Sequence, residues 1–273
     1  LGFGQAFFYI GYVYTKSSYN KIKDMDEKFK FPTETVELPS RGLLYPEGNP
    51  LRSGKIEMKY MTAKEEDILT NQNYIKDGSV LDRLVKSLIV TKIDYNDLIV
   101  GDKNAVMVAA RVLGYGADYT FKYQDEEVTV DLSTLESTYL NEDAMVEPGV
   151  NKFEFTCPST KAVIEFKLLS GNDDKKIKSE IKGLQKINKL SSPEMSTRLK
   201  YMILSVDGNT DGKDIREFVD NYFLARDSRS LREYIKSFQP DVDMTFNFES
   251  SGGIVEEVSL PMTVNFFWPD SKL

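Results

Sequence analysis

The sequence predicts an α+β protein made of two related units, each combining helices with antiparallel β-hairpins. Alternating apolar and polar residues, typical of half-buried strands, recur at 55–62 and 163–170, and each segment runs into a polar, acidic helix start. The distance from Asp102 to Phe121 equals that from Asp227 to Phe246, 19 residues each. Such an internal duplication is more typical of a scaffold than of an enzyme.

The first 30 residues are predicted to form an aromatic N-terminal arm and a polar linker. Residues 1–15 carry no charge and include Phe7, Phe8 and Tyr9. This stretch is too short to span a bilayer as a helix, and it lacks the basic region and cleavage site of a signal peptide. It either packs on its own domain, docks on another subunit, or is an artefact of where the sequence begins.

Residues 31–140 are predicted to form the first α+β unit. A short strand near Val36 leads into a loop at 39–50 with three prolines and two glycines, which disfavour regular structure. The apolar residues within this loop should pin it to the core. Helix starts are predicted from side chains that can bind free backbone N–H groups, namely Thr62 with Glu65 as a capping box, Ser79, and Asp102. A hairpin at 119–123 and 127–132 ends this unit.

Residues 151–270 are predicted to form the second unit. Its strand at 153–156 is followed by Pro158 and Ser159, which we align with Pro39 and Ser40 of the first unit. The predicted helix starts are Ser192 before Pro193, a start near Asp211 to Asp214, and a cap at either Asp227 or Ser228. The closing hairpin is predicted at 244–248 and 255–260.

Composition excludes several classes of function. The chain has 273 residues, a net charge of −8, no histidine and one cysteine. Without a block of basic residues, nucleic-acid binding is not expected. Without histidine, neither a Ser-His-Asp nor a Cys-His catalytic pair can form, and a zinc site lacks ligands. We therefore assign no catalytic, metal-binding or cofactor-binding residues, and expect no membrane span.

Three patterns suggest chemistry, and each has a simpler structural interpretation. Residues 207–212 resemble the first half of a calcium loop, but Phe218 stands where the final bidentate glutamate belongs. The acidic pairs 65–66, 173–174 and 256–257 would need a cleft and contrasting environments to act as an acid and a base. Cys157 precedes a proline in a turn and has no histidine to activate it.

Four motifs give the chain a resemblance to a known family. They are residues 38–45, the helix start at 61–70, residues 97–102 with Arg111, Gly114, Tyr115 and Gly116, and the aromatic cluster at 266–269. Together they resemble the baseplate hub and hub-assembly family of T-even-type contractile-tailed bacteriophages. Some members carry Cys-Pro-x-Cys-Gly knuckles at the hairpins, whereas only Cys157-Pro158 stands here, so a metal site at the hairpins is not expected.

The resemblance implies a structural or assembly role in the central hub of a tail baseplate. It implies no enzymatic activity, hetero-oligomeric contacts with other tail and baseplate proteins, assembly in the host cytoplasm, and a final place in the virion. The candidate partner-binding residues are Arg41, Leu43, Leu44, Tyr45, Phe7, Phe8, Tyr9, Phe266, Phe267 and Trp268. For the aromatic cluster at 266–268, core packing is the competing interpretation. A transient assembly chaperone, a carboxylate-dependent tail hydrolase and a calcium-stabilised module are the alternatives.

Overall fold

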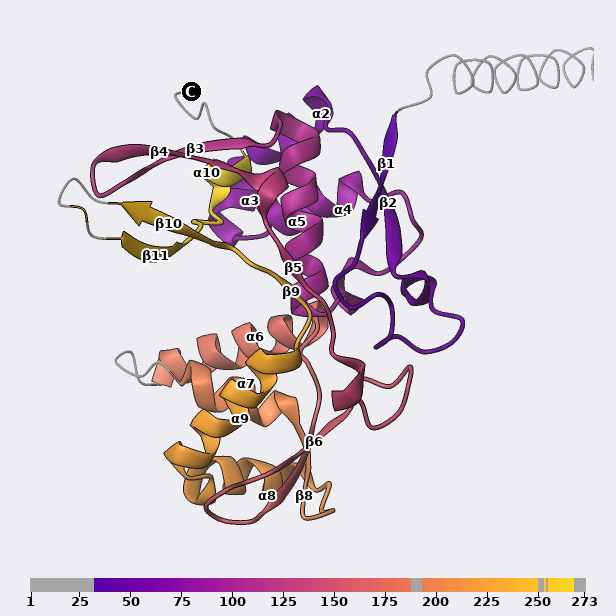
Figure 1. The fold of residues 1–273 in the computed structure, drawn as a ribbon, viewed down its shortest axis with the longest axis vertical. Helices are drawn as coiled ribbons and strands as arrows, with labels where there is room; N and C mark the ends of the chain where they lie inside the picture. Colours follow the sequence, from indigo (N-terminus) through magenta and orange to yellow (C-terminus); the bar gives the residue numbers. More distant parts are fainter. Residues whose placement is uncertain (1–31, 188–192, 250–252, 254, 268–273) are drawn as a thin grey trace, which may run out of the picture. The chain divides into compact units, whose positions relative to one another are not determined.

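The computed structural model describes residues 32–187, 193–249, 253 and 255–267 (Figure 1). Residues from Glu34 onward belong to one compact unit, and the chain up to Thr33 is separate from it. The described residues combine helices with small sheets of two or three strands, which confirms the α+β class. The division into units at 31–140 and 151–270 stays a prediction. The predicted arm and linker at 1–30 lie outside the described residues.

Two strands open the described chain and enclose the long loop. β1 (Thr33–Glu37) pairs with β2 (Lys55–Lys59). The backbone N–H of Leu38 donates to the carbonyl of Gly54 at 2.8 Å and closes the loop between them. β2 alternates as predicted, with Ile56 and Met58 buried and the residues between them exposed. Met58 also bridges Ile89, so β2 has contacts on both edges.

Four helices follow β2: α2 (Ala63–Leu69), α3 (Gln72–Asp77), α4 (Val80–Leu88) and α5 (Val100–Tyr115). The predicted capping box is confirmed at α2, because the N–H and hydroxyl of Thr62 donate to Glu65 Oε2 at 3.1 and 2.6 Å. The buried face of α4 consists of Val80, Leu84, Val85 and Leu88. Short 3-10 turns occupy Pro50–Ser53, Tyr95–Asp97, Leu132–Thr134 and Glu142–Ala144.

The second group of elements surrounds a three-stranded sheet. The strands are β6 (Phe153–Thr156), β7 (Val163–Phe166) and β8 (Ile203–Val206), with β7 in the centre and both pairings antiparallel. The helices are α6 (Gly171–Ile187), α7 (Glu194–Met202), α8 (Gly212–Glu217), a π-helical turn (Phe218–Tyr222) and α9 (Ala225–Phe238). Asp211 caps α8 within the predicted range, since its carboxylate accepts from the N–H groups of Lys213 and Asp214.

Two predicted helix caps are wrong, and a third lies at the predicted position without its side-chain bond. α5 begins after Ile99 and α9 after Leu224, so Asp102 and Asp227 lie inside the first helical turn. Both carboxylates bind distant loops instead of their own helix ends. Ser79 precedes α4 but makes no cap hydrogen bond, and its hydroxyl accepts from Arg83 Nε. Ser192 lies outside the described residues, and α7 begins at Glu194, after Pro193.

Two antiparallel hairpins lie against each other through aromatic rings (Figure 1). One is β3 (Asp118–Tyr123) with β4 (Glu126–Asp131), and the other is β10 (Thr245–Glu249) with β11 (Val255–Ser259). The ring of Phe246 packs edge-on against Phe121 at 5.4 Å, and Tyr123 packs edge-on against Phe248 at 5.0 Å. Both hairpins were predicted at these positions, but their mutual packing was not.

Backbone contacts join the first group of elements to the second. The N–H of Val100 donates to the carbonyl of Leu169, and that of Gly171 donates to the carbonyl of Leu98, each at 3.0 Å. β5 (Ser137–Thr138) pairs with β9 (Asp241–Val242), which follows α9. These contacts fix the start of α5 between segments that lie far apart in the sequence.

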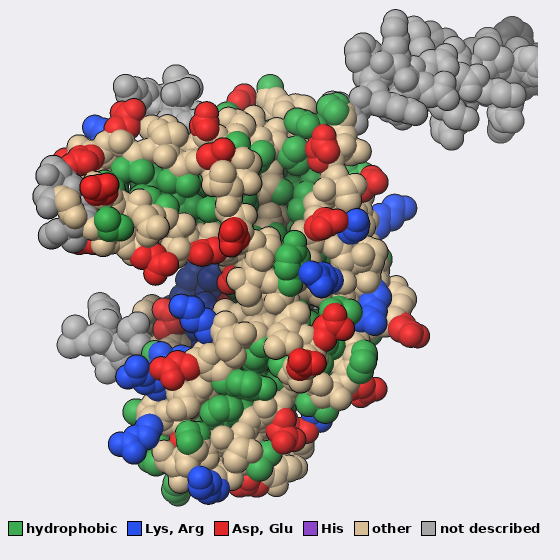
Figure 2. Space-filling view, viewed as in Figure 1, with side chains coloured by type: hydrophobic (Ala, Val, Ile, Leu, Met, Phe, Trp, Pro, Cys, Tyr) green, Lys and Arg blue, Asp and Glu red, His purple; other side chains and the backbone are tan. Residues whose placement is uncertain are grey.

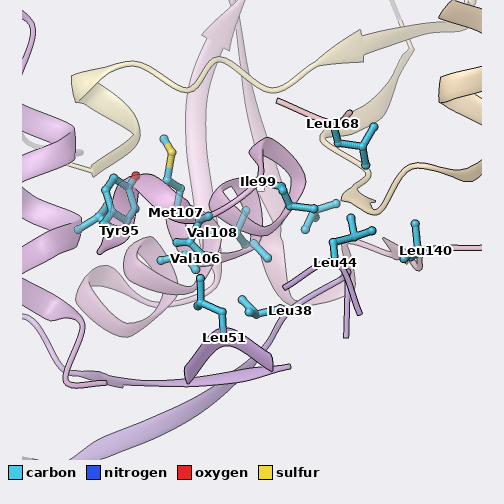
Figure 3. Close-up of a cluster of buried hydrophobic side chains, with 14 of the residues drawn as sticks. Leu38, Leu44, Leu51, Tyr95, Ile99, Val106, Met107, Val108, Leu140 and Leu168 are labelled. Carbon is cyan, nitrogen blue, oxygen red and sulfur yellow. The ribbon is translucent and has the colours of Figure 1, made fainter. Parts of the chain in front are cut away.

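Buried apolar residues from both groups of elements form one cluster, part of which is drawn in Figure 3. The short helix α10 (Val264–Phe267) contributes Phe266 and Phe267, both 0% exposed. Phe266 packs edge-on against Tyr119 at 4.8 Å. The described end of the chain therefore completes the core beside α5 and β3.

Candidate functional site

The buried carboxylate of Asp102 anchors the loop after β1 through hydrogen bonds. Asp102, in the first turn of α5, accepts from the N–H of Ser40 at 2.9 Å and from its hydroxyl at 2.6 Å. The hydroxyl of Tyr45 also donates to Asp102, at 2.6 Å, and accepts from the N–H of Ile99 at 3.1 Å. A residue at each end of the 40–45 segment is thus fixed to the start of α5.

Burial and hydrogen bonding act in opposite directions on Asp102. Removal from water raises the pKa of this carboxyl, while donation from Ser40 and Tyr45 lowers it, and the net pKa is raised. Burial, together with the neighbouring Asp102 charge, also raises the pKa of Tyr45. The tyrosine therefore stays protonated and available as a donor, which keeps this loop anchor intact at neutral pH.

Backbone geometry leaves this loop little freedom. Gly42 has φ of 77°, and a Cβ added there would stand 2.4 Å from the carbonyl oxygen of Arg52. The guanidinium of Arg52 donates to the carbonyls of Gly42 and Leu43 at 3.3 and 3.0 Å. The loop is therefore fixed on two sides, by the start of α5 and by the turn before β2.

Among the predicted partner-binding residues of this loop, Arg41 is exposed and the others are partly or wholly buried. The backbone φ angle of Arg41, 52°, is uncommon for a residue other than glycine. The guanidinium lies 4.2 Å from the ring centre of Tyr139, which is 45% exposed. Leu43 is half-buried, and Leu44 and Tyr45 are 3% and 4% exposed. Figure 3 draws Leu44 among the core side chains.

The remaining predicted partner-binding residues divide into two groups. Phe266 and Phe267 are buried, so their side chains serve core packing in this conformation. Phe7, Phe8, Tyr9 and Trp268 lie outside the described residues.

The segment at 139–150 lies beside the loop, a contact that the sequence analysis did not predict. The N–H of Leu140 donates to the carbonyl of Pro39, and that of Gly149 donates to the carbonyl of Leu43. Its apolar side chains Tyr139, Val146 and Val150 are 45%, 55% and 38% exposed. We call Arg41, Tyr139, Val146 and Val150 the loop surface. Exposed large apolar side chains in one short segment mark such a surface in a structure, but their exposure cannot be read from the sequence.

A second anchored turn follows β6 and resembles the first. Asp227, in the first turn of α9, accepts from the N–H groups of Ser159 and Thr160 at 2.7 and 3.1 Å and from the Thr160 hydroxyl at 2.9 Å. Burial raises the pKa of Asp227, but these bonds outweigh burial and the net pKa is lowered. In both turns, an acid of a helix first turn holds the residues after a proline.

Two helix starts also carry the same set of contacts. Lys59, Thr62 and Glu65 are each separated by three residues, as are Lys167, Ser170 and Asp173. In each set the lysine bonds one acid oxygen, at 2.8 and 2.7 Å. The backbone N–H and hydroxyl of Thr62 or Ser170 bond the other oxygen. Burial raises the pKa of Glu65 and Asp173, but these bonds outweigh burial and the net pKa of each is lowered.

The other acids of the three pairs are also engaged or exposed. Glu66 accepts from the hydroxyl of Tyr115, and Asp174 pairs with Arg198 at 3.1 Å. Glu256 and Glu257 lie on the exposed strand β11. No two of these pairs share one of the described pockets.

The calcium-like segment and the cysteine both have structural contacts. Asp207 accepts from the N–H of Val163, Asn209 from that of Asp211, and Asp211 caps α8. Within the described residues, no three acids, histidines or cysteines gather as a metal site. Cys157 is buried, and burial raises the pKa of its thiol.

Comparison with protein families, curated proteins and solved structures finds no match to this chain. In the part of the chain that the structure describes, no helix is long and apolar enough to cross a membrane.

Proposed function

We propose that this chain is a structural or assembly component of the central hub of a bacteriophage tail baseplate. It acts through contacts with neighbouring tail proteins, within a hetero-oligomeric assembly formed in the host cytoplasm and retained in the virion. The motif resemblance supplies this assignment. The observation that supports it is the rigid loop surface, where Arg41 stays exposed while Ser40 and Tyr45 are fixed to Asp102.

A surface fixed before binding loses little conformational entropy when a partner docks. The cation of Arg41 over Tyr139 gives this surface both a charge and an aromatic ring, which are common in interface centres. Val146 and Val150 add exposed apolar area on the same segment as Tyr139. Such a surface suits a neighbouring protein that presents an acidic group beside an apolar one.

The proposal includes an internal duplication. The two Lys, Ser/Thr and acid sets support it because they share residue types and spacing. The two turns held by Asp102 and Asp227 support it because each acid lies in a helix first turn and binds the residues after a proline. The bridges of Met58 with Ile89 and of Phe166 with Ile203 add a third match, since each isoleucine directly follows a helix of nine residues. Two similar units would let one chain contact two neighbouring subunits.

The test is capture of identified tail proteins by the tagged full chain in cells infected by a phage that encodes it. Arg41→Glu is expected to reduce recovery of these proteins about tenfold, as for a residue central to an interface. Arg83→Glu is the matched control, because Arg83 is also exposed and lies 4.2 Å from a tyrosine ring, that of Tyr74. Recovery without tail proteins, or equal recovery by both variants, overturns the proposal.

Mass spectrometry of purified virions separates the two forms of the role. An incorporated hub subunit is expected in the particles at constant copy number. A transient assembly factor would occur in the infected lysate and be absent from virions.

A further inference from the structure

An apolar groove lies between α7 and α9. Its walls are formed by Glu194, Met195, Arg198, Leu199, Met202 and Arg232, and its volume is about 340 Å³. Met195 is 52% exposed, an unusual position for a large apolar side chain beside two buried helix faces. A smaller cavity of about 150 Å³ shares Arg198 and Met202 with it and adds Leu168, Leu169 and Pro240. Apolar surface therefore continues past the groove.

The matching face of α4 is covered. Ile89 directly follows α4, and Ile203 directly follows α7. Counting back from these two residues, Leu199 and Met202 correspond to Val85 and Leu88, which are both 0% exposed. Helices α2, α3 and α5 contact α4. Around α7, the described residues supply no helix equivalent to α3, and the groove stays accessible. Methionine-lined grooves between helices commonly accept an apolar segment of another chain.

The positive charge at the rim of the groove comes from Arg232, because Arg198 is paired with Glu194 at 3.3 Å and with Asp174 at 3.1 Å. Among the described residues, Arg232 donates to the carbonyl of Ser228 and has no carboxylate within ion-pair distance. Residues 171–240 contain fourteen basic and eleven acidic side chains, although the whole chain has a net charge of −8. Figure 2 shows Lys and Arg side chains gathered over these helices. A segment that enters the groove is therefore favoured if it carries acids beside an apolar residue.

The hairpin β10–β11 carries acidic side chains beside an exposed apolar residue. Val255 is 61% exposed, the largest value among the exposed large apolar side chains of the described residues, and it precedes Glu256 and Glu257. Residues 241–259 contain five acidic and no basic side chains, and 118–131, which form the neighbouring hairpin, contain five acidic and one basic. Acidic side chains gather over these hairpins in Figure 2. The hairpin and the groove are thus complementary in both charge and hydrophobicity.

We infer that the groove between α7 and α9 binds the β10–β11 hairpin of a second copy of this chain. In the head-to-tail arrangement that we infer, each contact joins one groove to one hairpin, and a pair keeps one free groove and one free hairpin. Such contacts continue into a ring or a filament. This inference goes beyond the proposed baseplate role and does not depend on it.

Sedimentation velocity of the full chain over a range of concentrations tests the inference. Association is expected at low salt and should weaken at high salt, because the screening length falls from about 10 Å at 0.1 M to about 3 Å at 1 M. Arg232→Glu and Glu256→Arg are each expected to weaken association about tenfold, and the double variant should recover most of the loss. A native chain that stays monomeric at every concentration overturns the inference.

Mixing two defective variants gives the sharpest result. Met195→Asp places a charge in the groove and should abolish binding there. Val255→Asp should likewise abolish binding by the hairpin, so each variant alone should be monomeric. A mixture keeps one intact groove and one intact hairpin, and should form one-to-one dimers and nothing larger. Val90→Asp is the control, since Val90 is 48% exposed and belongs to neither surface. It should associate like the native chain, and thermal unfolding followed by circular dichroism checks that every variant is folded.

If the mixture stays monomeric while the native chain associates, the contact is not head-to-tail and the inference fails. If Met195→Asp and Val255→Asp associate like the native chain, a different surface is responsible and the inference fails as well. Neither result bears on the baseplate role, which the Arg41→Glu capture experiment tests separately.

Discussion

Single buried carboxylates organise both proline turns, but their ionisation has opposite effects on stability. The folded pKa of Asp102 is raised above its usual value of 3.8, and that of Asp227 is lowered below it. Ionised Asp227 therefore contributes stability above about pH 3.8, and this contribution is lost as pH falls through the folded pKa. For Asp102 the folded state binds the proton more tightly, so its ionisation reduces stability as pH rises from 3.8 through its folded pKa.

Replacement of each carboxylate by the neutral amide should reveal this difference. Asp227→Asn is expected to lower the free energy of unfolding at pH 7 by about 2 kcal/mol, because it weakens three hydrogen bonds to a charged acceptor. Its deficit should shrink as pH falls below 3.8, where Asp227 in the parent protein also becomes neutral. Asp102→Asn should cost less at pH 7, because the amide needs no ionisation in a buried site. Urea unfolding at pH 7 and pH 3 measures both.

Asp125→Asn serves as the control for charge alone, since Asp125 is exposed in the β3–β4 turn at a φ of 64° that asparagine also tolerates. Equal deficits for Asp102→Asn and Asp227→Asn at pH 7 would contradict the assignment of opposite pKa directions.

At the scale of elements, the start of α5 depends on a very close approach of two backbones. A Cβ added to Gly101 would stand 1.8 Å from the carbonyl oxygen of Pro240, which is backbone and cannot swing away. Gly183, inside α6, has open space at the corresponding position. The two helical glycines therefore form a matched pair with opposite expected outcomes.

Gly101→Ala is expected to lower the free energy of unfolding by about 3 kcal/mol or more, because α5 and β9 must separate. Gly183→Ala should raise it by about 0.5 to 1 kcal/mol, because alanine loses less backbone entropy in a helix. Chemical denaturation of the two variants beside the parent measures both changes. A Gly101→Ala protein as stable as the parent would contradict the close approach of α5 to Pro240.

Sequence patterns predicted the elements that depend on neighbouring residues. The capping box of Thr62 and Glu65 and both hairpins use signals within a few residues of each other, and the structure contains them. The roles of Asp102 and Asp227 were missed because their partners lie 62 and 68 residues away. An acid near a helix start looks like a cap in sequence, whether it binds its own helix or a distant turn.

The candidate surface around Arg41 also depends on contacts between residues that lie far apart in the sequence. Residues 38–45 stood out as a loop with apolar residues, and the expectation that these residues pin the loop is confirmed at Leu44 and Tyr45. Their burial leaves Arg41 as the fully exposed member of the predicted set in this loop. Tyr139 became part of that surface only through tertiary contact, and nothing near it in sequence indicates Arg41.

At the scale of the whole molecule, the two groups of elements share one buried apolar cluster and several backbone hydrogen bonds. The return of β9 to β5 and the packing of β10–β11 against β3–β4 tie the end of the chain to its first part. Two independent domains would have separate cores and few such contacts. Two related units that complete one core should instead lose their structure together.

We therefore expect residues 34–273 to unfold in a single cooperative transition. Leu84→Ala in α4 and Leu231→Ala in α9 remove leucines that are 0% exposed, and each should lower the free energy of unfolding by about 2 to 5 kcal/mol. Because the core is shared, both variants should shift the same transition, with circular dichroism and calorimetry giving coincident midpoints. If Leu84→Ala moved one transition and left a second at the parent midpoint, the units would fold separately. The shared contacts would then join two finished domains rather than complete one core.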